Sequence, residues 1–186
     1  MTDLAQALRA FAELFEQMGI RYVVMGGLAV RVHGIPRPTH DVDFTLAISR
    51  ERLPELYARV RALGFTVPQE YEGGWVDQVA GMPLVKFRLY LHRRGVDIDA
   101  FLAETPFQEQ ILSRRQRVAL DNLEVWLVSP EDLILLKLLA GRPRDIADIG
   151  DILFTQGRLD EAYLRRNAKS LGVLDALERL LAQPPA

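Results

Sequence analysis

Apolar residues recur at helical spacing along several stretches of the chain. In residues 3–18, six of them fall on one face of a helix: Leu4, Leu8, Phe11, Leu14, Phe15 and Met18. The same spacing predicts further helices over residues 50–63, 106–113 and 131–140, and a pair of helices over 159–182. The stretch 131–140 is apolar on nearly every side, so we expect that helix to be buried.

Shorter apolar runs, bounded by glycines and turn residues, predict strands between these helices. The run 22–25 is rich in valine and suits a buried strand, and a second strand-like run contains Asp41 and Asp43. Further strands are expected over residues 65–68, 75–80, 84–92, 95–101, 115–120 and 124–128. The pattern therefore predicts a chain in which strands and helices are mixed.

A pair of glycines, Gly26 and Gly27, ends the first predicted strand and precedes a short helix over residues 28–33. Glycine adopts dihedral angles that other residues resist, and it lets a ligand approach the backbone closely. The start of a helix presents unpaired N–H groups and the positive end of a dipole, which suits a phosphate. This stretch therefore predicts a phosphate-binding turn.

Two pairs of aspartates occupy alternate positions in predicted strands. Side chains alternate across a strand, so Asp41 and Asp43 share one face, and so do Asp97 and Asp99. Two positions along a strand span roughly 6–7 Å, and carboxylates at that separation can share one or two hard cations such as Mg²⁺. An ordinary loop or strand-edge acid is the alternative for Asp41 and Asp43. Alternation alone does not choose between Asp97 and Asp99.

The composition narrows the class of protein. The 186 residues carry a net charge of −2 and 49% hydrophobic residues, which is typical of a globular protein with its own core. There is no cysteine, which excludes disulfides, thiolate zinc sites and cysteine nucleophiles, and the three histidines lack the spacing of a zinc site. No apolar run approaches the roughly 20 residues of a membrane span, and the N-terminus carries no signal peptide, so we expect a cytoplasmic protein with no membrane partner.

The glycine pair and the first aspartate pair occur in an informative order. Gly26-Gly27, a short helix and then Arg37-Pro38-Thr39-His40-Asp41-Val42-Asp43 resemble the nucleotidyltransferase superfamily with the DNA polymerase β-like catalytic fold. More narrowly, the chain resembles the small AbiE-type nucleotidyltransferases, many of them toxins of toxin–antitoxin pairs. The resemblance implies an α/β (α+β) fold with a mixed β-sheet flanked by helices, plus C-terminal helices. It implies a catalytic core in residues 1–128 and a helical part packed on that core in 129–186.

The same resemblance implies roles for residues further along the chain. In AbiE-like sequences a third Asp opens a short apolar run before a Thr-Pro-Phe-like segment. Counting back from Thr105-Pro106-Phe107 places it on Asp99 and leaves Asp97 as an edge residue or a secondary contact. A Lys on a later helix, followed by a basic residue and Asp-x-x-Asp, corresponds to Lys137 and to Arg144-Asp145-Ile146-Ala147-Asp148.

Lys137 has two interpretations within its apolar helix. Either it extends to the rim of the core, as long basic side chains usually do, or it reaches a triphosphate or an acidic partner. Asp145 and Asp148 fall on one face of the following helix. They either steady Lys137 or Arg144, or simply begin a helix at its positive end.

The resemblance implies a Mg²⁺-dependent nucleotidyltransferase that moves a nucleoside monophosphate from an NTP to a hydroxyl acceptor, either a tRNA 3′ end or a protein. It further implies the toxin of a toxin–antitoxin pair, with a cognate antitoxin as partner. The implied catalytic and metal-binding residues, which would hold two Mg²⁺ ions with Mn²⁺ as the alternative, are Asp41, Asp43 and Asp99. The implied nucleotide-binding residues are Gly26, Gly27, Arg37, Lys137 and Arg144. Two other interpretations stay open: an inactive nucleotide-binding or interaction module, and a metal-dependent glycosyltransferase.

Overall fold

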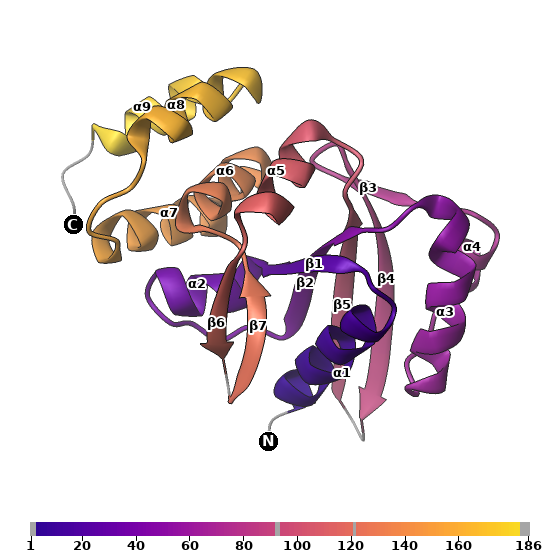
Figure 1. Cartoon of the computed structure of the whole chain (residues 1–186). Helices are drawn as coiled ribbons and strands as arrows, with labels where there is room; N and C mark the ends of the chain where they lie inside the picture. Colours follow the sequence, from indigo (N-terminus) through magenta and orange to yellow (C-terminus); the bar gives the residue numbers. More distant parts are fainter. Residues whose placement is uncertain (1–2, 92–93, 121, 183–186) are drawn as a thin grey trace.

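The computed structural model describes residues 3–91, 94–120 and 122–182, and its centre is a seven-stranded sheet (Figure 1). In chain order the strands are β1 (Arg21–Met25), β2 (Asp41–Ala47), β3 (Asp77–Val79), β4 (Met82–Leu91), β5 (Arg94–Leu102), β6 (Gln116–Leu120) and β7 (Leu123–Leu127). Across the sheet they run β3-β4-β5-β2-β1-β7-β6. β2 pairs in parallel with β5, and β1 with β7, while the other neighbours are antiparallel. This mixed sheet confirms the predicted α/β (α+β) fold class.

Helices connect the strands and cover the sheet. They are α1 (Asp3–Gln17), α2 (Gly26–His33), α3 (Leu53–Ala62), α4 (Gln69–Glu72), α5 (Pro106–Arg114), α6 (Pro130–Ala140), α7 (Pro143–Thr155), α8 (Glu161–Ser170) and α9 (Leu174–Leu181). A 3₁₀ turn, η1 (Arg50–Arg52), precedes α3. The helix α6 packs against α7 and α8, so the C-terminal helices form a layer beyond the end of the sheet (Figure 1).

One face of the sheet is held by aromatic packing. Phe11 and Phe15 of α1 are fully buried, and their ring centroids lie 6.0 and 5.1 Å from that of Phe44 on β2. Phe11 also stacks on Phe87 of β4, with 5.6 Å between centroids. Because side chains alternate along a strand, the neighbours of these aromatic residues on β2 and β4 point to the opposite face. The α1 side of the sheet is therefore the apolar core, and polar residues of the same strands gather on the other side.

Several predicted elements differ from the observed ones. The stretch 65–68 is not a strand: it makes a single bridge, Thr66 to Arg88, and the four-residue α4, too short to show a periodic pattern, follows it. The strand expected over 75–80 is only three residues long because the chain turns at Ala80 and Gly81, which have φ angles of 51° and 74°. The last residue of the strand expected over 84–92 lies outside the described residues.

The buried helix predicted over 131–140 is confirmed as α6. Ser129 caps it by accepting a hydrogen bond from the Asp132 backbone N–H, and apolar residues from Leu133 to Leu138 are buried. The backbone N–H of Val128, just before this helix, donates to the Val24 carbonyl at 3.0 Å, which ties the helix to the centre of the sheet. A division into residues 1–128 and 129–186 stays a prediction. No helix among the described residues is long and apolar enough to cross a membrane.

Candidate functional site

Two rows of charged side chains cross β4, β5 and β2 on the face of the sheet opposite α1. From β4 to β2, the first row is Arg88, Asp97 and Asp41, and the second is Lys86, Asp99 and Asp43. The register alone brings the two predicted aspartate pairs together, because β2 and β5 are neighbours and run parallel. Directly opposite residues of paired strands have Cβ atoms about 4.5–5.5 Å apart, so the side chains of each row are within reach of one another.

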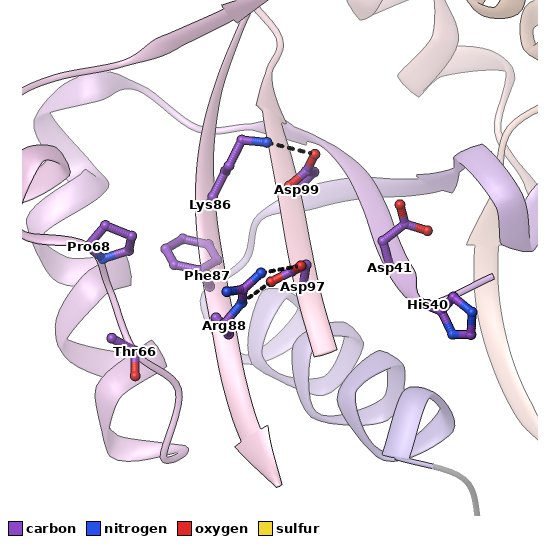
Figure 2. A pocket seen from close by; sticks show the side chains of 9 residues that line it. All are labelled: His40, Asp41, Thr66, Pro68, Lys86, Phe87, Arg88, Asp97 and Asp99. Atoms are coloured by element: carbon purple, nitrogen blue, oxygen red, sulfur yellow. Dashed lines mark hydrogen bonds and ion pairs between the residues drawn. The ribbon is translucent and has the colours of Figure 1, made fainter. Parts of the chain in front are cut away.

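Between β4 and β5, each row places a basic side chain opposite an aspartate. Lys86 Nζ lies 3.3 Å from Asp99 Oδ2, and the Arg88 guanidinium donates to both carboxylate oxygens of Asp97 (Figure 2). The side chains of Arg88 and Asp97 are about half exposed, whereas that of Asp99 is only 22% exposed. The bond from Arg88 holds the pKa of Asp97 below its usual range. The charge of Asp97 is therefore balanced by Arg88, and the pair lies on the surface of the sheet.

Between β5 and β2 the rows join like charges. Asp97 is opposite Asp41, and Asp99 is opposite Asp43. Like charges directly opposite each other destabilise a sheet, so this arrangement costs folding free energy. Burial, followed by the negative charges of Asp41 and Asp99, raises the pKa of Asp43 to about 7. Burial also raises the pKa of Asp99, against the opposing effect of Lys86.

The glycine turn lies against the second row. Gly26 begins α2 with a φ of +63°, and a Cβ added to it would meet Asp43 Oδ2 at 1.8 Å. Both the backbone conformation and the space thus require glycine at this position. Met25, the residue before the helix, provides no side-chain cap to the first N–H groups. A helix start with no side-chain cap therefore lies directly beside a carboxylate.

Lys137 is buried and does not extend to the rim of the core. Its Nζ lies 2.9 Å from Asp145 Oδ1 and 2.5 Å from Asp148 Oδ2, so of the alternatives for the two aspartates the structure shows that they steady Lys137. Arg37 also binds Asp148, with two bonds of 2.6 and 2.7 Å, and Arg144 donates to the Pro38 carbonyl at 3.0 Å. These three basic residues, predicted to bind nucleotide, thus all contact protein groups; nucleotide contact by them stays a prediction.

Arg142 is a residue that the sequence reasoning missed as part of the site. It binds Asp145 through Nε at 2.6 Å, yet its side chain is 73% exposed. It lines a small cavity of about 80 Å³ together with Gly26 and Asp43, and its positive charge lowers the pKa of Asp43. In the sequence Arg142 is only a basic residue before Pro143, because it is the fold that brings the start of α7 next to the glycine turn.

A larger cavity of about 430 Å³ lies on the other side of the carboxylates (Figure 2). Figure 2 shows Asp99 between Lys86 and Asp41, with Thr66 and Pro68 on the opposite wall. The carboxylates thus separate two cavities, one at the glycine turn and one over β4 and β5. The arrangement provides separate places for two reactants on either side of one group of acids.

The carboxylates fit a divalent cation by their chemistry. Carboxylate oxygens are the ligands that Mg²⁺ and Mn²⁺ prefer, and a bound cation would offset the like charges of Asp41, Asp43 and Asp99. Within the described ranges, no group of three or more His, Cys, Asp or Glu residues is already gathered into a metal-binding cluster. His33, one of the three histidines, is buried with Nε2 against the Val128 carbonyl at 2.7 Å, and His92 lies outside the described residues.

Comparisons with known proteins agree with this geometry. The family model described as a nucleotidyltransferase of unknown function (DUF6036) matches residues 2–171. The solution structure of the antibiotic-resistance factor ANT(2″)-Ia is similar, with a TM-score of 0.58 and 19% identity, over 96% of this chain and 97% of that one. No curated protein matches the sequence.

Two further solved structures share the fold. The lincosamide antibiotic adenylyltransferase LnuA, bound to lincomycin, has a TM-score of 0.52 and 17% identity, over 84% of this chain and 99% of that one. A nucleotidyltransferase-like antigenic protein from Paracoccidioides brasiliensis has a TM-score of 0.53 and 17% identity, over 99% of this chain and 94% of that one. At these identities the likeness concerns the fold alone.

Proposed function

The chain belongs to the DUF6036 family of nucleotidyltransferases, and from that premise we propose that it moves a nucleoside monophosphate from an NTP to a hydroxyl acceptor, with Mg²⁺ or Mn²⁺ as cofactor. One observation carries the proposal: the like-charged pair Asp43 and Asp99 lies beside the start of α2, which lacks a side-chain cap. The carboxylates suit a divalent cation and the helix start suits a phosphate, and nucleotidyl transfer needs both at one place.

The triphosphate would bind at the glycine turn. The start of α2, whose first backbone N–H groups have no side-chain cap, lies beside Asp43, and Gly26 and Gly27 carry no side chain that would keep phosphates away. The exposed Arg142 guanidinium beside the turn supplies a positive charge within reach. The observed bonds of Arg37, Lys137 and Arg144 run to α7 and to the loop before β2, and they hold this part of the site in place. We further propose that these three residues contact the phosphates.

Asp41, Asp43 and Asp99 would hold two Mg²⁺ ions. When bound, such ions neutralise the developing charge on the attacking and leaving oxygens of an in-line displacement at phosphorus. The aspartates are well suited to this because their own mutual repulsion is relieved by the same ions, which raises the affinity for cations relative to isolated carboxylates. In the protein alone, burial first and then this repulsion raise the pKa of Asp43.

The acceptor hydroxyl would enter from the larger cavity, where Asp41 and Asp99 are both part of the wall. Asp99 would accept the hydroxyl proton from the wall of this cavity. The acceptor oxygen then forms a bond to the α-phosphorus as the bond from that phosphorus to the β-phosphate oxygen breaks. The products are the acceptor carrying a nucleoside monophosphate, and pyrophosphate.

The proposal also covers the acceptor and the biological role of the protein. The order of motifs from Gly26 to Asp148 supports an AbiE-type toxin that modifies a tRNA 3′ end or a protein and is held by a cognate antitoxin. The structural likeness to adenylyltransferases whose structures contain lincomycin or adenylyl-tobramycin adds small hydroxyl compounds to the acceptors worth testing.

A transfer assay tests the proposal. The protein is mixed with Mg²⁺ and each α-³²P-labelled NTP in turn, and total tRNA, cell protein and small hydroxyl compounds are offered separately. We expect label on one acceptor class with the wild type and at least a 100-fold loss with Asp41→Asn or Asp99→Asn, because each removes a charge that acts in the transition state. Equal transfer by the wild type and both variants would contradict the mechanism, and NTP binding without any transfer would favour an inactive nucleotide-binding module.

A further inference from the structure

We propose that Thr39 is a positioning residue for Asp41, and that residue 27 is glycine because the Thr39 side chain occupies the space beside it. The inference rests on the proposed function only in that Asp41 is taken as a metal ligand. It concerns a residue of the loop between α2 and β2 that has no part in the mechanism described above.

The contact between Thr39 and Gly27 is unusually close. A Cβ added to Gly27 would lie 2.4 Å from Thr39 Oγ1 and 2.8 Å from Thr39 Cβ, well inside the distance that real Cβ atoms keep. The third neighbour of that position, at 3.5 Å, is also an atom of Thr39. Unlike Gly26, Gly27 is not in the left-handed region, so its backbone does not call for glycine. The space taken by Thr39 is what excludes a side chain there.

The Thr39 hydroxyl is used in turn to hold Asp41. Its Oγ1 donates to Asp41 Oδ1 at 2.6 Å, a short bond of the charge-assisted kind. Asp41 is the first residue of β2 and is exposed, so without this bond its side chain is free to change rotamer. The bond fixes one carboxylate oxygen of Asp41 and does not use the second. Ligand orientation by such outer hydrogen bonds typically changes metal affinity 10- to 100-fold.

The loop that carries Thr39 is fastened on its approach to β2. Arg37 forms two bonds to the buried carboxylate of Asp148 on α7, and Arg144, also on α7, donates to the Pro38 carbonyl. The backbone just before Thr39 is thus held against α7, while Asp41 is held in the sheet. Between these two anchors the Thr39 side chain lies over Gly27.

The first experiment measures Mn²⁺ affinity of the protein without nucleotide, from the electron paramagnetic resonance signal of free Mn²⁺. Thr39→Val keeps the shape and removes the hydroxyl, and we expect it to weaken Mn²⁺ binding about tenfold with a thermal unfolding midpoint close to that of the wild type. Thr39→Ser keeps the hydroxyl and should retain most of the affinity. Unchanged Mn²⁺ affinity in Thr39→Val would overturn the proposal.

A second experiment moves the hydroxyl across the contact. Thr39→Gly removes both the hydroxyl and the steric block, so residue 27 can then carry a side chain. We expect Mn²⁺ affinity to be weak in Thr39→Gly and in the double variant with Gly27→Ala, and to recover at least threefold in the double variant with Gly27→Ser, because only serine returns a hydroxyl to the same place. Equal affinity in the serine and alanine double variants would show that the two positions do not share one hydroxyl site.

These results separate the inference from the proposed function. Normal Mn²⁺ binding in Thr39→Val together with nucleotidyl transfer by the wild type would remove the role of Thr39 and leave the function intact. Weakened Mn²⁺ binding in Thr39→Val, with no transfer by the wild type to any acceptor, would support the role of Thr39 in a metal site whose reaction is not nucleotidyl transfer.

Discussion

The molecule contains two groups of closely placed aspartates with opposite electrostatic properties. On the sheet, the pKa values of Asp43 and Asp99 are raised. In the cluster around Lys137, Asp145 and Asp148 are fully buried, yet their pKa values are lowered. Burial acts in the same direction on all four carboxyls, so it does not explain the difference.

The difference lies in the cations that contact each group. In the Lys137 cluster, burial is outweighed by direct bonds: Lys137 reaches both carboxylates, and Arg142 and Arg37 each add a second partner to one of them. On the sheet, Lys86 contacts Asp99 at 3.3 Å, and no described residue donates a side-chain hydrogen bond to Asp43. The group around Lys137, whose charges are compensated, is part of the structure, whereas the group on the sheet is the one that we propose to bind a divalent cation.

Removing Lys137 should break the compensated group and produce the largest loss of stability. Lys137→Met keeps the apolar stem and leaves two buried carboxylates without their shared partner, so we expect the free energy of unfolding to fall by about 3–5 kcal/mol. Chemical denaturation measures this loss. Lys169→Met, on the exposed surface of α8, is the matched control and should change stability by less than about 0.5 kcal/mol. Similar small effects of both substitutions would mean that the cluster contributes little.

Stability should depend on pH with opposite signs in the two groups. The contribution of Asp43 falls as pH rises, whereas the contribution of Asp145 and Asp148 falls as pH drops. The pKa of Asp43 rises from 3.8 to about 7 on folding, so between these values the folded protein holds a proton that the unfolded chain has released. The metal-free protein should therefore lose stability as pH rises from about 4 to about 7, by at most about 4.5 kcal/mol at 1.4 kcal/mol per pKa unit. Stability from Asp145 and Asp148, whose pKa values are lowered, is lost only at acid pH, as they protonate.

Asp43→Asn is the variant that isolates this effect. It removes one titrating group but keeps the shape and leaves Asp99, whose pKa is also raised. Its stability should therefore fall less than that of the wild type over the same pH range and should exceed that of the wild type at pH 8. Urea unfolding in buffers without divalent metal gives the comparison. A parallel pH dependence in the wild type and Asp43→Asn would show that the raised pKa belongs to another group.

Local patterns predicted most of the fold because the relevant signals are local. The amphipathic spacing of Leu8, Phe11 and Phe15 predicted α1, and the apolar spacing further on predicted α5 and α6. In the structure Thr105 and Ser129 cap these two helices, each accepting a hydrogen bond from the backbone N–H three residues on. The prediction of a strand over 65–68 was wrong because the apolar residues there fill the core from a loop that pairs with β4 at only one bridge.

The sequence predicted the candidate site unevenly. Alternation put Asp41 with Asp43, and Asp97 with Asp99, but only the parallel register of β2 and β5 showed which acids face each other. The partners of Lys137 and the position of Arg142 depend on how α6 and α7 pack, and no spacing rule contains that information. Contacts between residues that are far apart in the chain thus decided which charges are compensated.

Arg37 is the second cation bound to Asp148, and its substitution should have an intermediate effect. Arg37→Gln removes the two bonds to Asp148 but leaves Lys137 in place, so we expect a loss of about 1.5–3 kcal/mol in the free energy of unfolding. Chemical denaturation measures the structural role of Arg37, and the KM for NTP in the transfer assay measures its role in nucleotide binding. A raised KM at unchanged stability would instead support direct nucleotide binding by Arg37.

Asp97 offers the smallest effect and the sharpest test within the sheet. It pairs with Arg88 at a position where both side chains are about half exposed, and such pairs contribute less than about 1 kcal/mol. Asp97→Asn also removes the like charge opposite Asp41, which offsets part of that loss. We therefore expect stability and transfer activity close to those of the wild type, while Asp99→Asn, two residues further along the same strand face, loses transfer. If Asp97→Asn and Asp99→Asn reduced transfer equally, both aspartates would act in the reaction. The ion pair with Arg88 would then not mark Asp97 as a structural residue.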